Sequence, residues 1–387
     1  MPRVNDLSRS LTALDQDSTL IAVIEMGVKS WLVGALVPGI YRQPEKKLDP
    51  EAEGLLRQLR RWCDEAARAG RPVKRLCVAY EAGRDGFWLA RWLRRQGIEA
   101  HVMHPTSIPV KRDHRRAKTD RLDVNLLMRA FLGWLRGETE HCSMVAIPTL
   151  AEEDAKRPSR ERETLIGERT SIINRMKSTL VRFGIRGFKV TLRKAAEKLE
   201  ALRTPEGVTL PPHTMSELKH DMERLRLVRA QIEAIETARL ERLDQAPEAG
   251  PHAMIRLLAR IMGVGIETAD LLVNEALSRN LRDRRAVARY AGLTGSPDES
   301  GKRRREKGLA RAGNGRVRRA MIQLAWRWLR FQEASELAQW YRRRTADGRG
   351  DTRKTLIVAL ARKLLIALWR LVTTGQFTHD LALHPAS

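Results

Sequence analysis

Four acidic side chains lie at positions in this sequence from which they could act together. Glu25 ends an apolar run in LIAVIEMG, and Glu81 ends another in LCVAYEAGRDG. Asp120 and Asp123 are three residues apart at the start of an expected helix, a spacing that puts both on one helix face. Carboxylate oxygens are the ligands that Mg²⁺ prefers, and Mg²⁺ offsets the charge of a reacting phosphate. The pattern therefore predicts a Mg²⁺-dependent phosphoryl-transfer site.

These acids also have structural interpretations. The helix dipole favours acids in a first helical turn, and Thr119 is a good N-cap. For Asp120 and Asp123 alone, a structural role is therefore as well supported as a catalytic one. Glu25 is harder to explain in this way, because a charge that ends an apolar strand needs a partner. Asp85 we assign to the turn that follows Glu81.

A serine in a very basic segment is the second candidate. Ser300 precedes Gly301 in YAGLTGSPDESGKRRREKGLARAGNGRVRR, where we expect a turn-rich loop. A serine hydroxyl is a weak nucleophile unless a metal or base activates it, so from the pattern alone Ser300 is a weak candidate, and Ser296 is scarcely weaker. Basic runs of this kind are usually solvated faces that bind phosphate. The residues expected to contact nucleic acid are Arg115, Arg116, Lys118, Lys302, Arg303, Arg304, Arg305, Arg311, Arg316, Arg318 and Arg319.

A pair of glycines is the third candidate. Gly263 and Gly265 lie in LARIMGVGIETADLLVNE, where an apolar segment, a short glycine turn and a helix resemble a helix–hairpin–helix motif. In that motif the glycines expose backbone N–H groups to a nucleic-acid phosphate at a helix N-terminus. An ordinary turn between two helices is the alternative.

The composition indicates a polyanionic partner. The chain has 387 residues, with 72 lysines and arginines against 47 acids, a net charge of +25 and a pI near 10.8. Nucleic acid fits this balance better than a membrane surface does. No apolar stretch is long enough to span a bilayer, and the N-terminus lacks the apolar core of a signal peptide. The three cysteines show no metal or disulfide spacing, which suits a reducing compartment. We expect a cytoplasmic protein that binds nucleic acid and no membrane.

Strands and helices should alternate in the first part of the chain. Apolar runs predict strands at Leu20–Ile24, Trp31–Leu36, Leu76–Tyr80 and Ile98–Met103. Amphipathic spacing predicts helices over Glu51–Ala69, over Phe87–Gln96 and from about Thr119 to Arg136. This order favours an α/β domain with a mixed sheet, over residues 1–148.

Helices should dominate the rest of the chain. Apolar residues at helical spacing predict two long helices, over Arg162–Phe183 and Met215–Leu243, joined by a loop rich in proline and glycine. They could form a bundle arm within one chain or an oligomerising coiled coil. A mostly α-helical domain over 250–345 and a C-terminal segment over 346–387 follow this central segment, 149–249. Thr355–Trp369 could mimic a membrane-surface helix, but Arg362 and Lys363 interrupt it, so we expect it to pack against the preceding domain.

Four segments together resemble a known family. AVIEMGVKSWLVG, YEAGRDGFWLARWL, RRAKTDRLDVNLL and YAGLTGSPDESGKRRREKGLARAGN look like bacterial insertion-sequence transposases of the IS110 family, in the same order over nearly the whole chain. The resemblance implies a RuvC-like domain of RNase H fold with a DEDD carboxylate set, a coiled coil, and a helical domain with a nucleophilic serine. By motif, Glu25, Glu81, Asp120 and Asp123 fall at the four acidic positions and Ser300 at the serine. Glu25 departs from the family, which usually has Asp there, and no proline follows GLT.

The resemblance also implies a mechanism and partners. Ser300 would attack a DNA phosphodiester and form a covalent phosphoserine link, with Mg²⁺ held by the four carboxylates. The DNA partners would be the element ends and the target, chosen by a noncoding bridge RNA, and the protein would act as a homo-oligomer, a dimer or a tetramer. Two alternatives stay open: a junction-type nuclease with water as nucleophile, and a non-catalytic nucleic-acid-binding remnant in which Glu25 has impaired the site.

Overall fold

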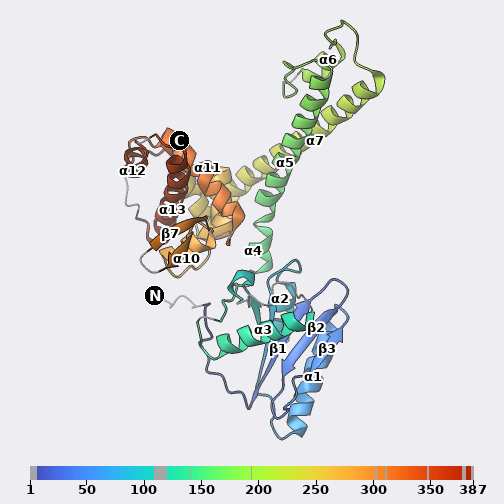
Figure 1. The fold of residues 1–387 in the computed structure, drawn as a ribbon, viewed down its shortest axis with the longest axis vertical. Helices are drawn as coiled ribbons and strands as arrows, with labels where there is room; N and C mark the ends of the chain where they lie inside the picture. The colour runs from blue at the N-terminus through green and yellow to red at the C-terminus, as the bar shows by residue number, and fades with distance from the viewer. Residues whose placement is uncertain are drawn as a thin grey trace. The chain divides into compact units, whose positions relative to one another are not determined.

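The fold comes from a computed structural model of the chain, which divides into two compact units, Met1–Ala151 and Glu152–Ser387 (Figure 1). The structure describes residues 7–108, 120–139, 141–192, 194–300, 303–309, 312–346, 348–376 and 381–384, with the backbone alone at 120, 296–300 and 303–307. The first unit is mixed α/β and the second is mostly helical, so the predicted fold class is confirmed at this level.

The first unit is built on one five-stranded sheet, ordered β3-β2-β1-β4-β5. β1 runs antiparallel to β2, and β2 runs antiparallel to β3, whereas β1, β4 and β5 are parallel. Four of these strands follow the apolar runs of the sequence. The strands are β1 (Thr19–Met26), β2 (Trp31–Leu36), β3 (Glu45–Leu48), β4 (Arg75–Glu81) and β5 (Glu99–Met103).

The two edge strands differ from the central ones. β3 has the sequence EKKL, without an apolar run, and its Lys46 and Lys47 are exposed, which is why the sequence did not predict it. At the other edge, β5 is covered by a later segment: Met103 forms an antiparallel bridge with Met144, and Val145 donates a backbone hydrogen bond of 2.7 Å to Val102.

Helices cover both faces of the sheet, and alternation along the strands decides which residue faces which helix. Residues Leu20, Ala22 and Ile24 pack with α1 (Ala52–Arg68) and α2 (Trp88–Arg95). Their neighbours Ile21 and Val23 pack instead with α3 (Asp120–Leu135). A short 3₁₀ turn, η1 (Pro105–Ser107), follows β5. The core between the sheet and α3 contains Ile21, Val23, Cys77 and Ala79 of the strands and Val124, Leu127, Met128 and Phe131 of α3.

A glycine lets α3 approach the sheet closely. A Cβ atom at Gly34 in β2 would stand 2.5 Å from Cγ1 of Val124, nearer than such contacts allow. Val124 follows Asp123 in the chain, so the absence of a side chain at Gly34 sets how near the start of α3 lies to β2.

The second unit begins with a pair of long antiparallel helices, α5 (Arg157–Arg182) and α7 (Pro212–Gln245), with α6 (Ala195–Glu200) between them (Figure 1). The short α4 (Leu150–Asp154) precedes α5. Pro158 lies in the first turn of α5, where its missing N–H costs little. The guanidinium of Arg175 holds the carboxylate of Asp221 through hydrogen bonds of 2.8 and 2.6 Å across the pair. Coiled-coil packing and self-association stay predictions.

The rest of the second unit has one apolar core. Its long last helix, α13, lies in that core through Leu360, Leu364 and Leu368, so packing rather than a membrane surface accounts for the apolar C-terminal run. Across the described part of the chain, no helix combines the length and apolar character needed to cross a membrane. The elements are α8 (Gly250–Ala259), α9 (Ile266–Leu272), a π-helical turn η3 (Val273–Leu277), α10 (Arg284–Tyr290), β6 (Gly295–Ser300), β7 (Arg303–Leu309), α11 (Gly315–Phe331), α12 (Glu336–Arg344) and α13 (Gly350–Thr374).

Candidate functional site

Three of the four predicted acids line one pocket in the first unit. Glu25, Glu81 and Asp123 border a pocket of about 360 Å³, although nearly a hundred residues separate Glu25 from Asp123 in the chain. Asp120 is the first residue of α3, and the structure describes only its backbone. Thr119 lies outside the described residues.

The sheet register explains why Glu25 and Glu81 meet. Ile24 pairs with Tyr80 in parallel register, so the next residues, Glu25 and Glu81, leave neighbouring strands at the same edge of the sheet. Both glutamates continue the alternation of residues that face α3. The two glutamates therefore emerge at the same edge of the sheet, and their joint action with the start of α3 stays a prediction.

A fourth acid, Asp85, also lines this pocket. Sequence reasoning assigned it to the turn after Glu81, because nothing in the pattern of a loop tells where its side chains point. Among the described residues, however, the Asp85 carboxylate accepts no hydrogen bond from the turn. Its one close polar neighbour is Arg84, whose Nη2 lies 3.8 Å from Oδ2. Asp85 lies in the turn between β4 and α2, as the sequence suggested, and its side chain also borders the pocket.

A tyrosine anchors the loop that carries Asp85. The hydroxyl of Tyr80 donates a hydrogen bond of 3.1 Å to the carbonyl of Gly86 and accepts one of 3.3 Å from the N–H of Ala90. Burial raises the pKa of Tyr80 to about 12, so this hydroxyl keeps its proton at neutral pH. The loop between Glu81 and α2 is thus tied to the strand that presents Glu81.

The donor chemistry of the pocket fits Mg²⁺. Its carboxylates supply oxygen ligands, which Mg²⁺ prefers to nitrogen or sulfur. Within the described side chains, no three carboxylate, histidine or cysteine groups are gathered closely enough to hold a metal ion. Glu25 and Glu81 each make other interactions in this structure. The residue types suit a Mg²⁺ site, and the described side chains would have to converge to form it.

In the second unit, Ser300 lies in a β-hairpin rather than in the loop we expected. β6 and β7 are antiparallel, and Ser300 pairs with Arg303 as the last pair before the turn. Gly301 and Lys302, which follow Ser300 in the sequence, lie outside the described residues. The strand ladder provides the backbone hydrogen bonds that a loop of this length would leave to water. Ser300 therefore stands next to the tip of a hairpin.

The basic residues around this hairpin fall into three groups. Arg303, Arg304 and Arg305 open β7, opposite Ser300, Glu299 and Asp298. Ser296 is in β6. The predicted contacts that lie outside the described residues are Arg115, Arg116, Lys118, Lys302 and Arg311.

The third group, at the start of α11, is engaged within the protein. Arg316 contacts Glu163 of α5 at 2.8 Å, and Arg319 contacts the same carboxylate. Arg318 donates a hydrogen bond of 3.1 Å to the carbonyl of Ala312. Of these three, Arg318 has a structural role, and the other two share the carboxylate of Glu163, so their contact with nucleic acid stays a prediction.

The glycine pair lies between two helices, as its sequence suggests. Gly263 has a φ of +91°, which only glycine adopts without strain, and a Cβ there would meet Phe331 at 3.2 Å. Gly265 precedes α9 with a φ of −72°, is exposed and has open space beside it. The C-terminal segment supports the turn, because Met262 donates a backbone hydrogen bond of 3.0 Å to Ala382. Phosphate binding at Gly265 stays a prediction.

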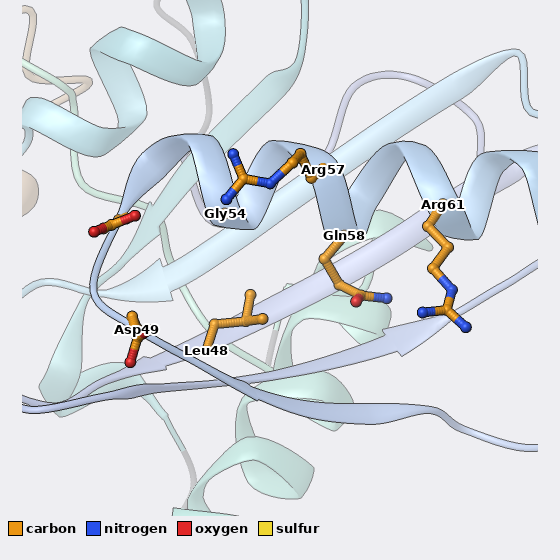
Figure 2. A pocket seen from close by; sticks show the side chains of 7 residues that line it. Leu48, Asp49, Gly54, Arg57, Gln58 and Arg61 are labelled. Carbon is orange, nitrogen blue, oxygen red and sulfur yellow. The ribbon is translucent and has the colours of Figure 1, made fainter.

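Another pocket in the first unit, of about 320 Å³, lies where the chain leaves β3 and enters α1 (Figure 2). Its lining includes Leu48 and Asp49 together with Arg57, Gln58 and Arg61 of α1. The side chains that line this pocket carry both positive and negative charges and lie largely on the surface of α1. We assign no chemistry to this pocket.

Comparison with known proteins identifies the family. The sequence model described as Transposase IS116/IS110/IS902 family matches residues 255–342. A protein of Sinorhizobium fredii with the name "Putative transposase y4rJ" is 41% identical over 388 residues, which cover 97% of each chain. The chain belongs to the IS116/IS110/IS902 family of transposases.

Two more distant relatives of this transposase have similar names. A "Probable family 20 transposase" of Pseudomonas aeruginosa is 26% identical over 76% of this chain and 83% of its own. "Putative transposase y4qE" of Sinorhizobium fredii is 25% identical over 83% of this chain and 84% of its own. Membership of the family implies that the transposase binds DNA and acts in its transposition and recombination. The match over residues 255–342 includes the β6–β7 hairpin and the glycine turn.

Proposed function

We propose that this transposase cuts and rejoins DNA through a serine nucleophile assisted by a carboxylate-bound Mg²⁺ ion. The observation that carries the proposal is the single pocket that Glu25, Glu81 and Asp123 share at the carboxyl ends of parallel strands. Carboxylates from three separate elements border this pocket, and their oxygen atoms are the ligands that Mg²⁺ prefers. This clustering favours a catalytic interpretation over a structural one.

We assign the first unit to the RNase H-like, RuvC-like fold of the resemblance described above. A sheet with an antiparallel part, β3-β2-β1, and a parallel part, β1-β4-β5, is compatible with that assignment. In this assignment the four acids of the DEDD set are Glu25, Glu81, Asp120 and Asp123.

In the proposed reaction, the hydroxyl oxygen of Ser300 forms a bond to a DNA phosphorus atom as one phosphorus–oxygen bond of the DNA backbone breaks. The serine hydroxyl loses its proton, and the released strand gains one on the oxygen that leaves. The product is a phosphoserine ester, which keeps a bond that a second DNA hydroxyl can attack, so strands can be rejoined without a high-energy cofactor. Arg303 faces Ser300 in the backbone register, and the arginines of β7 would hold the DNA phosphates.

The Mg²⁺ ion would supply Lewis acidity, stabilising the charge that develops on the phosphate. Glu25, Glu81, Asp120 and Asp123 would hold it through carboxylate oxygens. The acids belong to the first unit and Ser300 to the second. We further propose a homo-oligomer and a noncoding bridge RNA that selects target and donor DNA, which the net charge of +25 would help to bind.

A recombination assay tests the serine. A plasmid-borne element with its flanking noncoding DNA is supplied to the wild type, to Ser300→Ala and to the control Ser296→Ala. We expect recombination to disappear in Ser300→Ala alone, with DNA binding retained. A denaturing gel should also show wild-type protein attached to cleaved DNA. Full recombination by Ser300→Ala, or cleavage without attached protein, would point instead to a nuclease with water as nucleophile.

A further inference from the structure

We propose that Arg327 of α11 binds a phosphate of duplex DNA beside the glycine turn between α8 and α9. This contact depends neither on the serine nor on the metal of the proposed function. The guanidinium of Arg327 donates a hydrogen bond of 2.7 Å to the hydroxyl of Thr268, which lies in the first turn of α9.

Arg327 is a cation that is partly removed from water without a counterion. Its side chain is partly buried, and its Nε atom is buried without a hydrogen-bond partner. Burial lowers the pKa of Arg327, and among the described residues no acid forms an ion pair that would oppose this effect. A buried charge is unfavourable until a group of opposite charge binds it. Arg327 therefore has a charge and N–H donors that an incoming anion can use.

The two acids of α9 do not compensate Arg327, because other residues hold them. The carboxylate of Glu267 contacts the guanidinium of Arg162 at 3.0 Å. The carboxylate of Asp270 accepts a hydrogen bond of 2.6 Å from the hydroxyl of Ser159. Both contacts come from α5, so the acids nearest to Thr268 in the chain are engaged away from α11.

The end of α11 is fixed against the glycine turn. The side-chain amide of Gln332 donates a hydrogen bond of 2.9 Å to the carbonyl of Met262. A Cβ atom at Gly263 would stand 3.2 Å from Phe331, which follows Arg327 by one helical turn. Two contacts thus hold the segment that carries Arg327 beside the turn, so its guanidinium needs little reorganisation to bind a ligand there.

The open side of the glycine turn lies close to the group that Arg327 holds. Gly265 is exposed, with open space where a side chain would stand. Its carbonyl accepts a hydrogen bond of 2.9 Å from the N–H of Thr268. A phosphate that approaches Gly265 therefore comes within about one helical turn, roughly 5 Å, of the Thr268 hydroxyl and its arginine partner.

Arg327 also continues a polar row along one face of α11. Arg316, Arg319 and Gln323 precede it at spacings of three and four residues, and these three line a pocket of about 190 Å³ with residues of α5 and α9. From Arg316 to Arg327 the helix rises about 16 Å, close to the length of five base pairs of duplex DNA. The net charge of +25 and the transposase family favour DNA as the anion.

The test is binding of the full-length protein to a duplex DNA fragment, without divalent ions, over a range of salt concentrations. Arg327→Met removes the charge and keeps the apolar bulk. We expect it to bind DNA about tenfold more weakly at physiological ionic strength. The magnitude of the slope of log affinity against log salt concentration should fall by about 1.

The control variant is Arg342→Met, which removes the same charge from α12, where Arg342 pairs with Glu333 at 3.4 Å. It should keep the wild-type slope. The melting temperature of the DNA-free protein separates a binding role from a structural one. Replacement of an uncompensated, partly buried charge by an apolar group should leave that temperature unchanged or raise it.

A salt slope equal to that of the wild type in Arg327→Met would overturn the inference, whatever the melting temperature. An equal fall in slope in Arg342→Met would also overturn it, because the effect would then follow net charge alone. If Arg327→Met does not fold, Arg327→Gln gives the same readout, since its amide can still donate to Thr268. None of these outcomes bears on Ser300 or on the carboxylates, whose test is recombination.

Discussion

The guanidinium of Arg160 donates two hydrogen bonds to the carboxylate of Glu275, of 2.7 and 3.1 Å. Glu275 is only 2% exposed and also accepts a bond of 2.9 Å from Asn314, whose own side chain caps α11 through the N–H groups of Arg316 and Val317. One buried carboxylate thus connects the start of α5 to the start of α11, the helix that follows the serine hairpin.

Glu275→Gln should destabilise the second unit, because the substitution leaves Arg160 without its buried partner. Breaking such a pair costs about 3 kcal/mol. Urea unfolding at pH 7 would measure the loss. Glu163→Gln, which removes a more exposed ion pair, is the control and should cost less than about 1 kcal/mol. Equal losses from the two substitutions would contradict this account.

The effect of Glu275 should also depend on pH. Burial alone would raise the pKa of Glu275, but the hydrogen bonds from Arg160 and Asn314 hold it below its usual value. A carboxylate whose pKa is lower in the folded than in the unfolded state stabilises the fold at pH values above its unfolded pKa, here near 4.5. This stabilisation is lost as the pH falls through the pKa of the folded state. The difference in stability between wild type and Glu275→Gln should therefore shrink below about pH 4.5. If the stability difference between the wild type and Glu275→Gln grew on acidification, the pKa of Glu275 would be raised in the folded state rather than lowered.

Gly34→Ala should weaken both the packing and the metal site of the first unit. The new methyl group would meet Val124 and push the start of α3, with Asp123, away from the sheet. We expect a loss of about 1–3 kcal/mol in stability and weaker Mn²⁺ binding. Adding Val124→Ala removes the clash, so the double variant should recover Mn²⁺ affinity. Failure of that recovery would mean that Gly34 does not act through α3.

The two glycines of the turn between α8 and α9, Gly263 and Gly265, should respond differently to alanine. Gly263→Ala forces a residue with a side chain into a φ of +91° against Phe331, and we expect a loss of at least about 1 kcal/mol in stability. Gly265→Ala meets open space and should keep the melting temperature. If a phosphate approaches the backbone at Gly265, this second variant should nevertheless bind DNA more weakly. Unchanged DNA affinity in Gly265→Ala would remove the phosphate role of the glycine turn.

The arginines at the start of α11 should separate by their salt dependence. If Arg316 and Arg319 exchange Glu163 for DNA phosphates, the double variant Arg316→Ala/Arg319→Ala should bind DNA with a weaker salt dependence. The magnitude of the slope of log affinity against log salt concentration should fall by about 1–2. Arg318→Ala removes a bond to the Ala312 carbonyl, so it should lower stability and leave the slope unchanged. A change of slope in Arg318→Ala would instead assign it to the DNA interface.

Much of the candidate site could be predicted from the sequence, because its acids end apolar runs. The run that ends at Glu25 and the run that ends at Glu81 became neighbouring parallel strands, so the two glutamates had to emerge together. Asp85 was not predictable in this way, since a loop has no periodicity to show which side chains face a pocket. The partner of Arg316 and Arg319, Glu163, lies about 150 residues away, and no local pattern connects them.

The prediction of strands from the sequence was limited in the same way, because it depended on local apolar patterns. Apolar strands such as β1 and β2 were located to within one or two residues. β3 was missed because its four residues include three charges, and β6 was missed because prolines, glycines and acids are poor strand formers that only pairing with β7 holds extended.

The two edge strands of the sheet, β3 and β5, affect how copies of the chain can associate. An open edge strand offers unpaired N–H and C=O groups to any other extended chain, and this is a common route to aggregation. Here the lysines of β3 repel a strand from a second, equally basic copy, and the segment around Met144 occupies part of the border along β5. Copies that gather on nucleic acid at high local concentration would thus be hindered from joining their sheets, and would meet through other surfaces.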